Sequence, residues 1–581
     1  MKDKRVIDRK GSTDVVSFEI AVGGEVLDYA KRIKYLSVTR GINRIPRAKI
    51  ILLDGDVAKE SFELSESDTF VPGALVEVKA GFNQKNKTIF RGLIVEHSIK
   101  MRKEQPSMLM LDCRDESFKL TLGRKRKFFY DSTDTEIIGE ILSGYKLDNK
   151  VDETGYQHRH MVQAAVTDWD FILSRAEVNG LVLNVIDGKI HVVKPNSSAD
   201  PDPSLVAGAT VLEFEGEMDM RHQMGSVVTR SWDFANQEVT EAEGKDKVNN
   251  YGNISAEQLS ENAGFNESSC YHTGNLKQEE LQGWADASLV KSRLAKIRGR
   301  VRLKGYDKLY PDQTLSLEGL GSRFNGNAYV SGVRHELSDG NWHTDVELGV
   351  DPNWFVDEQE IHESRAAGLL PGIEGLQIGI VTQLQDDPDG EHRVRITLPM
   401  IDLNSEGIWA RLALLDAGEK RGSFFYPEIG DEVVVGFLQG DPREGIVLGM
   451  LNSSAKPGPI DGSDDNHEKG FVTRSGMRVW FHDDDKSITI DTPKGNHVIL
   501  SEAEESIKVG DQNNNKLELT ASGIVMESPG NIQIKASGDV NIKGNNIDLS
   551  ANAAMVAKGT KSAEFSSAGM NTVKGSMVQI N

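Results

Sequence analysis

The stretch that decides the fold is Gly530-Asn-Ile532-Gln-Ile534-Lys-Ala-Ser, followed at once by Gly538-Asp-Val540-Asn-Ile542-Lys-Gly-Asn. Each unit contains a glycine, a spacer, an alternating apolar pair and a small or polar tail. One unit repeated along an axis sets a whole architecture. An apolar pair per unit buries too little surface in one chain to offset the entropy of ordering its backbone. The repeat therefore predicts several chains wound around one axis as a rigid rod. Looser copies flank it at Ile488/Ile490, Ile507/Val509, Leu517/Leu519, Ile524/Met526, Ile547/Leu549, Ala563/Phe565 and Val578/Ile580.

Composition places the chain among ordinary soluble, multidomain proteins. Its 581 residues carry 38% hydrophobic and 27% charged residues, and the length predicts roughly three to five domains. A net charge of −22 argues against a nucleic-acid binder, whose surface would be basic. The first ten residues are too charged for a signal peptide, and no apolar run is long enough for a membrane span. Cys113 and Cys270 form no disulfide framework or CxxC motif, so we expect two reduced structural thiols.

The first part of the chain alternates apolar and polar residues, which is typical of strands. Helices are predicted behind the capping box Thr133-Asp-Thr-Glu136, behind Thr167 as far as Asn179-Gly180, and over about residues 281–297. The polar, acidic stretch at about 236–280 is expected to be a long surface loop.

The N-terminal region contains a duplicated pattern. Residues 71–78, 89–97 and 108–112 form one run, and residues 310–317, 328–335 and 344–348 form a second. Each gives a turn with proline, a strand, a second strand with a glycine, and a closing alternating strand. The pattern predicts two similar antiparallel β domains, which in a trimer would present six quasi-equivalent barrels.

A compact β module follows at 375–453, between linkers rich in charged, small or turn-forming residues at 357–374 and 454–470. Proline and glycine frame tight turns, and Val433, Val435 and Phe437 make an alternating strand between them. We expect a five-stranded Greek-key barrel. Its signature residues are Trp409, Pro427, Gly430, Glu432, Gly440, Asp441 and Pro442.

The string Tyr426-Pro-Glu-Ile-Gly-Asp-Glu-Val-Val-Val-Gly-Phe-Leu-Gln-Gly-Asp-Pro442 resembles the OB-fold domain of VgrG-type spike proteins of contractile injection systems. Residues 41–55 and 167–180 resemble the hub of the same family. The resemblance implies a mainly β multidomain fold: a hub of two β-barrel domains with a few helices at 1–356, the OB-fold, and a triple-stranded β-helix at 471–581 formed by a homotrimer. It implies a structural role without catalysis, cofactor or metal.

The resemblance also implies partners. A hub of this kind sits on a sixfold tail tube and baseplate, and the rod carries a conical PAAR-like tip protein and effector cargo through a target membrane. We expect synthesis and assembly in the cytoplasm, followed by incorporation into an injection particle. The short spacing after Asn452 leaves no room for a lysozyme domain, and the C-terminus carries neither an effector domain nor a His-x-His apex. A separate tip protein is therefore expected, in contact with Met577, Val578, Gln579, Ile580 and Asn581.

The residues expected to fill the axis of the rod are the apolar members of the repeat. Polar Asn, Lys and Ser would face outwards and keep the rod soluble. Replacement of Val540 or Ile542 by Asp is predicted to prevent trimerisation. The axial set comprises Ile524, Ile532, Ile534, Val540, Ile542, Ile547 and Leu549.

Other chemistry is weakly supported. His158-Arg-His160 has no further ligand at metal spacing, and a surface loop explains it better. Asp386–Gly390 and Asp483–Asp485 lack a full Ca²⁺ loop and are predicted to be hairpin turns. Two alternatives to a spike remain open: a polysaccharide hydrolase or lyase on a single-chain β-solenoid with longer rungs, and a β-rich adhesin that would need an export signal.

Overall fold

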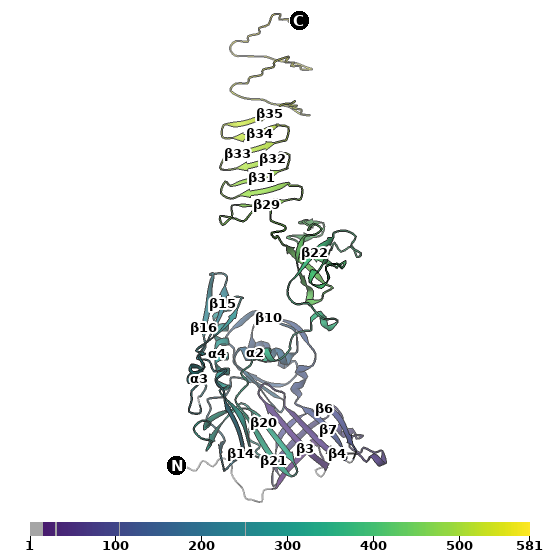
Figure 1. Ribbon diagram of the computed structural model, residues 1–581, viewed down its shortest axis with the longest axis vertical. Coiled ribbons are helices and arrows are strands. Elements are labelled where there is room, and N and C mark those ends of the chain that lie inside the picture. Colours follow the sequence, from purple (N-terminus) through teal and green to yellow (C-terminus); the bar gives the residue numbers. More distant parts are fainter. Residues whose placement is uncertain (1–14, 29–31, 104, 250, 581) are drawn as a thin grey trace. The chain divides into compact units, whose positions relative to one another are not determined.

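The structure is a computed structural model that describes residues 15–28, 32–103, 105–249 and 251–580. The chain divides into two compact units. One contains residues 1–373 with 439–441, and the other contains residues 374–438 with 442–581. Strands dominate both units (Figure 1).

The first unit is built on one 13-stranded sheet. Its order is β14-β18-β21-β20-β3-β4-β7-β6-β5-β1-β2, and β19 pairs with both β13 and β20. The strands are β1 (Val16–Val22), β2 (Glu25–Val26), β3 (Ile33–Gly41), β4 (Arg47–Leu53), β5 (Leu75–Phe82), β6 (Lys85–Arg102), β7 (Gln105–Arg114), β13 (Ser204–Val206), β14 (Val211–Met218), β18 (Ile297–Lys304), β19 (Gln313–Glu318), β20 (Gly326–Ser338) and β21 (Asn341–Leu348).

The predicted duplication is confirmed and is larger than the sequence indicated. The order β3-β4-β7-β6-β5 in the first half matches β14-β18-β21-β20-β19 in the second, and every neighbouring pair in both halves is antiparallel. Strand β20 then pairs with β3, which joins the halves into one sheet. The hub prediction described two barrel domains, whereas the described strands of the two halves share a continuous ladder.

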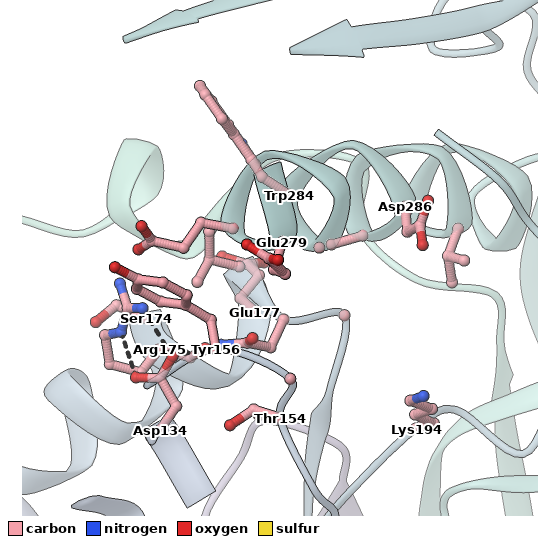
Figure 2. A pocket seen from close by; sticks show the side chains of 18 of the residues that line it. Asp134, Thr154, Tyr156, Ser174, Arg175, Glu177, Lys194, Glu279, Trp284 and Asp286 are labelled. Carbon is pink, nitrogen blue, oxygen red and sulfur yellow. Dashed lines mark hydrogen bonds and ion pairs between the residues drawn. The ribbon is translucent and has the colours of Figure 1, made fainter. Parts of the chain in front are cut away.

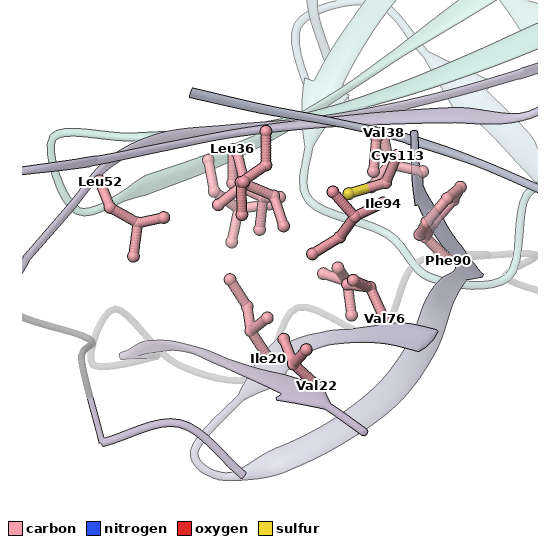
Figure 3. Close-up of a cluster of buried hydrophobic side chains, with 14 of the residues drawn as sticks. Ile20, Val22, Leu36, Val38, Leu52, Val76, Phe90, Ile94 and Cys113 are labelled. Carbon is pink, nitrogen blue, oxygen red and sulfur yellow. The ribbon is translucent and has the colours of Figure 1, made fainter. Parts of the chain in front are cut away.

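One face of the first half carries a tightly packed core (Figure 3). Leu36, Val38 and Phe90 are fully buried there, together with Cys113. Burial raises the pKa of the Cys113 thiol, with a smaller contribution from the Asp112 carboxylate, so this thiol is an inert core group. The second half has its own core on β18 to β21.

Two helices pack over smaller sheets in the same unit. The Thr133–Glu136 capping box begins α1 as predicted, and Thr167 caps α2, which ends at Asn179. Their apolar faces bury Ile137, Ile172 and neighbours in a separate core. The elements are α1 (Asp134–Ser143), α2 (Asp168–Val178), α5 (Phe355–Glu358), the pair β8 (Lys125–Thr133) and β10 (Gln157–Val166), and the sheet β9 (Asp148–Val151), β11 (Val182–Ile186) and β12 (Lys189–Val193).

The expectation of a long surface loop at 236–280 is wrong. This stretch forms β16 (Glu238–Glu243), α3 (Ala256–Ala263) and β17 (Glu267–His272). The strands β16 and β17 pair with β15 (Ser226–Asp233) in a small sheet that packs against α4 (Gln278–Leu294). Acidic side chains occupy the solvent side while Ala242 and Leu259 are buried. The high number of acidic residues concealed a pattern in which only one side of each element is exposed. A second capping box, Ser255–Gln258, starts α3.

The second unit begins with the predicted five-stranded closed barrel. Its order is β22-β23-β24-β28-β27, around a core that includes Val394, Ile396 and Val433. The elements are β22 (Gln377–Gln383), β23 (Val394–Thr397), α6 (Pro399–Asp402), β24 (Ile408–Leu412), β25 (Ala417–Gly418), β26 (Arg421–Gly422), β27 (Glu432–Phe437) and β28 (Gly445–Met450).

A seven-stranded antiparallel sheet follows the barrel, each strand paired with the next along the chain (Figure 1). The strands are short, as the repeat predicted, and the predicted turn at Asp483–Asp485 joins two of them. They are β29 (Glu468–Val472), β30 (Arg478–His482), β31 (Ser487–Asp491), β32 (His497–Ser501), β33 (Ser506–Gly510), β34 (Lys516–Thr520) and β35 (Gly523–Glu527).

Candidate functional site: the apolar face of the C-terminal sheet

Most of the apolar residues of β30 to β35 fall on one face of their sheet, and Trp480, Ile499 and Val525 lie on the other. Successive side chains of a strand point to opposite faces, and residues paired across strands share a face. The register pairs Ile488 with Leu500, and Leu500 with Ile507, and it continues this way along the whole sheet. Two apolar columns result: Phe481, Ile488, Leu500, Ile507, Leu519 and Ile524 in one, and Phe471, Val479, Ile490, Val498, Val509, Leu517 and Met526 in the other.

Beyond its first strand, where Phe425 stacks on Phe471, the described chain leaves much of this face exposed. Leu500 is 40% exposed, Ile507 is 41% exposed and Ile524 is 71% exposed. Burial of one such side chain contributes about 1.5–3 kcal/mol, so a row of them is a large unrealised stabilisation. An apolar patch this continuous marks an interaction surface.

The opposite face carries mainly polar residues, and charged side chains on it form ion pairs. Arg478 pairs with Asp491 at 2.5 Å, and Lys516 pairs with Glu527 at 2.9 Å, in each case across neighbouring strands. Such pairs keep a sheet soluble and discourage edge-to-edge association. The two faces therefore differ in chemistry: one carries the charged pairs, and the other carries most of the apolar side chains.

The segment 528–580, which contains the glycine repeat, differs in structure from the seven-stranded sheet before it. The described residues 528–580 contain no strand (Figure 1). From residue 529 to residue 580 their side chains are exposed. Of the predicted axial residues, Ile524 lies in β35 and the other six lie in this segment, where they are not brought together. Each is at least half exposed: Ile532, Ile534, Val540, Ile542, Ile547 and Leu549.

The predicted tip residues lie at the end of the same segment. Met577 and Ile580 are almost fully exposed, and Val578 and Gln579 belong to the same exposed stretch. Asn581 lies outside the described residues.

The OB-fold signature residues occupy turns and strands of the closed barrel. The backbone N–H of Gly430 donates to the Val381 carbonyl at 2.7 Å, with φ of +88°, a conformation that favours glycine. Trp409 on β24 lies under the Arg395 guanidinium, whose carbon is 5.8 Å from the ring centre. Pro427 and Asp441 are buried, Glu432 begins β27, and Gly440 and Pro442 lie in the turn before β28.

Contacts between the barrel and the sheet that follows it were missed from the sequence. Phe425 stacks on Phe471 with ring centres 5.3 Å apart, and Arg474 pairs with Glu428 at 2.7 Å. These contacts tie the loop before β27 to the first hairpin of the sheet. The adjacent aromatics Phe424 and Phe425 in a polar loop were the available signal.

A cavity of about 1190 Å³ in the first unit is an alternative candidate site (Figure 2). Arg175 on α2 donates two hydrogen bonds to Asp134, and Asn179 donates another at 2.8 Å. Burial alone would raise the pKa of the Asp134 carboxyl, but these bonds and one to His158 outweigh it and hold the pKa well below its usual range. Because both oxygens of the Asp134 carboxylate already accept hydrogen bonds, we interpret this cluster as a structural contact that holds α1, α2 and β10 together.

The expectation of a surface loop at His158–His160 is wrong. His158 lies in β10, is only 6% exposed, and contacts Asp134 and Glu280. His160, two residues further along the strand and on the same face, remains exposed. Within the described residues no cluster of three or more His, Cys, Asp and Glu side chains has metal-binding geometry. In the same part of the chain, no helix has the length and apolar character that a membrane crossing requires.

Two family models match the chain. Residues 12–339 match the Alg8 N-terminal domain, and residues 377–451 match the type VI secretion system/phage-baseplate injector OB domain. The second match covers the closed barrel.

Among curated proteins, the type VI secretion system spike protein VgrG1b of Pseudomonas aeruginosa is 27% identical over 127 residues, 21% of this chain and 17% of that protein. The spike protein VgrG3 of Vibrio cholerae is 31% identical over 96 residues, 15% of this chain and 9% of that protein. The chain thus spans less than a fifth of these relatives. The resemblance to VgrG-type spike proteins is confirmed by the OB-domain match and these relatives.

A solved structure, the prophage MuSo2 43 kDa tail protein from Shewanella oneidensis, is 12% identical and covers 58% of this chain and 98% of its own, with a TM-score of 0.45. A likeness at that level carries no argument about function.

Proposed function

This chain belongs to the family of the Alg8 N-terminal domain. Because an injector OB domain follows that region, we propose that the protein is the structural, non-enzymatic spike of a contractile injection system. In this proposal three copies assemble, the hub adapts to a sixfold tail tube and baseplate, and the C-terminal rod punctures a target membrane. The protein is made in the cytoplasm and leaves as part of the particle.

One observation carries the proposal: the uncovered apolar face of the sheet at 468–527. Three copies related by a threefold axis can turn these faces inwards and bury the columns around Leu500 and Ile507. Each copy keeps its polar face, with Arg478 and Lys516, in water. A single-chain solenoid enzyme is not favoured, since its rungs would be parallel, whereas these strands are antiparallel.

The repeat segment at 528–580 supports the same proposal of a trimeric rod. Backbone N–H and C=O groups need partners wherever they are buried. The described residues 528–580 pair with no strand of their own chain, so in the proposed rod the ladder partners come from the other two copies. Val540 and Ile542 then face the axis. A rod with ladders running between chains resists bending when a sheath drives it forward.

The hub and the C-terminal residues each imply a partner. The duplicated hub supplies two similar halves per chain, so three chains would present six similar halves to a sixfold tail tube. At the other end, Met577 to Asn581 would hold a PAAR-like tip protein, and effector cargo would travel with it. Nothing in this role calls for a catalytic group or cofactor.

The proposal is tested by the mass of the full-length protein in solution. The wild type is expected at three times the chain mass, and the variants Val540→Asp and Ile542→Asp are expected to lose the trimer because three carboxylates would meet at one level of the axis. Asn541→Asp is the matched control, since it adds the same charge on the opposite side of the backbone. A monomeric wild type, or trimeric Asp variants at both positions, would overturn the proposal.

A further inference from the structure

The cavity of Figure 2 is a cleft along one face of α4, and all the residues that line it belong to the first unit. We call it the α4 cleft. From α4 it is lined by Glu279, Gly283, Asp286 and Val290, among others. Positions three or four apart lie on one face of a helix, so this face of α4 forms the floor of the cleft. A Cβ atom at Gly283 would meet no neighbouring atom within 4 Å outside the local helix backbone, which means that the space above this residue is open.

One end of the α4 cleft is acidic. Tyr156 and Glu279 lie toward this end in Figure 2, and Glu153 lines the cleft from the same loop as Tyr156. Among the residues that the structure describes, the carboxylates of Glu153 and Glu279 have no ion-pair or hydrogen-bond partner. Burial raises the pKa of the Tyr156 hydroxyl, and the Glu280 and Glu279 carboxylates raise it further, so the negative charge reaches this ring. The carboxylates and the face of the ring together favour a positive group at this end.

The other end of the cleft is basic. Lys194, Lys245 and Lys247 line the cleft. The backbone N–H of Lys245 donates to the Asp286 carboxylate at 2.8 Å, and Figure 2 shows Asp286 and Lys194 toward the same end. The hydroxyl of Ser198, which also lines the cleft, donates to the Lys247 carbonyl at 2.7 Å. Because Ser198 follows Lys194 by four residues, these contacts bring the three lysines to one end of the cleft.

The amines of these lysines are available to an anionic group. Within the described part of the chain, no carboxylate forms an ion pair with the side chain of Lys194, Lys245 or Lys247. One oxygen of the Asp286 carboxylate already accepts hydrogen bonds from the Lys245 N–H and from the Gln282 amide, the latter at 2.7 Å. A protein with a net charge of −22 repels anions from most of its surface, so this end of the cleft is an exception that favours one.

We propose that the α4 cleft binds an extended peptide segment of another protein, which places a basic side chain at the acidic end and an acidic side chain at the basic end. Opposite charges at the two ends select such a partner and fix its direction in the cleft. The inference does not depend on the proposed trimer, since one chain supplies the whole lining of the cleft.

The dimensions of the cleft define the segment. Its volume of about 1190 Å³ exceeds the roughly 300–1,000 Å³ that is typical of small-molecule sites, so a peptide fits better than a small ligand. Glu279 and Asp286 are seven residues apart on α4, which is about 10 Å along the helix axis. An extended chain rises about 3.3 Å per residue, so the basic and acidic side chains of the segment should be three or four residues apart.

Defined peptides test the proposal on the full-length protein. The probes are short fluorescein-labelled peptides of alanine and serine that carry one arginine and one aspartate at different separations. Fluorescence anisotropy should show the tightest binding when the two charges are three or four residues apart, and weaker binding when they are adjacent. Peptides with two arginines or two aspartates at the best separation are the matched controls. They should bind about tenfold more weakly, because each places a like charge against one end of the cleft.

Three variants connect the binding to this cleft. Gly283→Leu places a side chain in the open space, and α4 should stay folded because leucine is a better helix former than glycine. This variant should bind the best peptide about tenfold more weakly or worse. Gly139→Leu is the matched control, since Gly139 is a glycine of α1 with equally open surroundings and lies outside the cleft lining. Lys245→Glu/Lys247→Glu should reverse the preference, so that the peptide with two arginines binds best.

Each outcome decides the proposal. A best separation of three or four residues, with binding weakened by Gly283→Leu and kept by Gly139→Leu, supports it. Equal binding of the peptide with two aspartates would show a site for anions alone, and unchanged binding by Gly283→Leu would place the peptide elsewhere. Either result overturns the proposal, as does the absence of binding at millimolar peptide. Loss of the wild-type oligomer in Gly283→Leu alone would show that a second copy of this chain fills the cleft, which also overturns it.

Discussion

The hub sheet and the C-terminal sheet are built from the same kind of strand but are completed in different ways. In the hub, alternation directs Leu36, Val38 and Phe90 into a core that the same chain closes. In the C-terminal sheet, alternation directs Leu500 and Ile507 onto a face that the same chain leaves open. The difference shows that period-2 patterning specifies which face is apolar without specifying what covers it.

That difference also separates two kinds of stability. The hub core should be intrinsic to one chain and independent of protein concentration. The stability of the C-terminal sheet should depend on assembly, because a folded oligomer is stabilised by mass action.

The largest effect is expected from removing an apolar side chain of the C-terminal sheet. Ile507→Ala should cost about 2–5 kcal/mol in each copy, so the loss is multiplied across an assembly. The trimer should dissociate at protein concentrations where the wild type remains intact, as measured by native mass spectrometry on dilution. Lys508→Ala, on the next residue and the opposite face, should leave the dissociation concentration unchanged. Equal behaviour of the two variants would mean that the apolar face is solvent-exposed in solution.

The sequence predicted the elements that depend on local chemistry. The Thr133 and Thr167 caps, the closed barrel and the short C-terminal strands were all readable because each needs only neighbouring residues. The 236–280 error arose where acidic residues on one side of β16 concealed the buried Ala242 on the other. Local charge counts cannot show which side of a strand faces solvent.

The site was predictable in kind but not in detail. The apolar pairs Ile488/Ile490 and Ile507/Val509 identified the face, but its two columns appeared only with the register of the pairs. His158 was misjudged because its partner Glu280 is distant in sequence. The strand order of the hub sheet was equally hidden, since it is a property of long-range pairing.

A smaller effect, confined to each chain, is expected in the hub core. Phe90→Ala should lower the free energy of unfolding by about 3–5 kcal/mol, since the side chain of Phe90, a residue of β6, is fully buried. Urea unfolding monitored by circular dichroism should give the same loss at every protein concentration, with the oligomer mass unchanged. Phe90→Leu, which keeps most of the volume, should lose much less. A concentration-dependent loss would show that the hub, too, is completed by other copies.

The smallest effect concerns pH at the seam where β20 pairs with β3, with His335 opposite Val38. Burial lowers the pKa of His335 to about 3, with a further contribution from the Arg40 charge, while its ordinary value is near 6.5. The unfolded chain therefore takes up a proton that the folded chain refuses, so stability falls as pH drops from about 6.5 towards 3, by at most about 1.4 kcal/mol per pH unit. His335→Asn, which keeps a polar group near the Thr344 hydroxyl, should be less stable at neutral pH but flatter between pH 6.5 and 5. Parallel pH profiles for the two proteins would show that His335 is accessible to protons in the folded hub, and that the seam is looser than its buried leucines indicate.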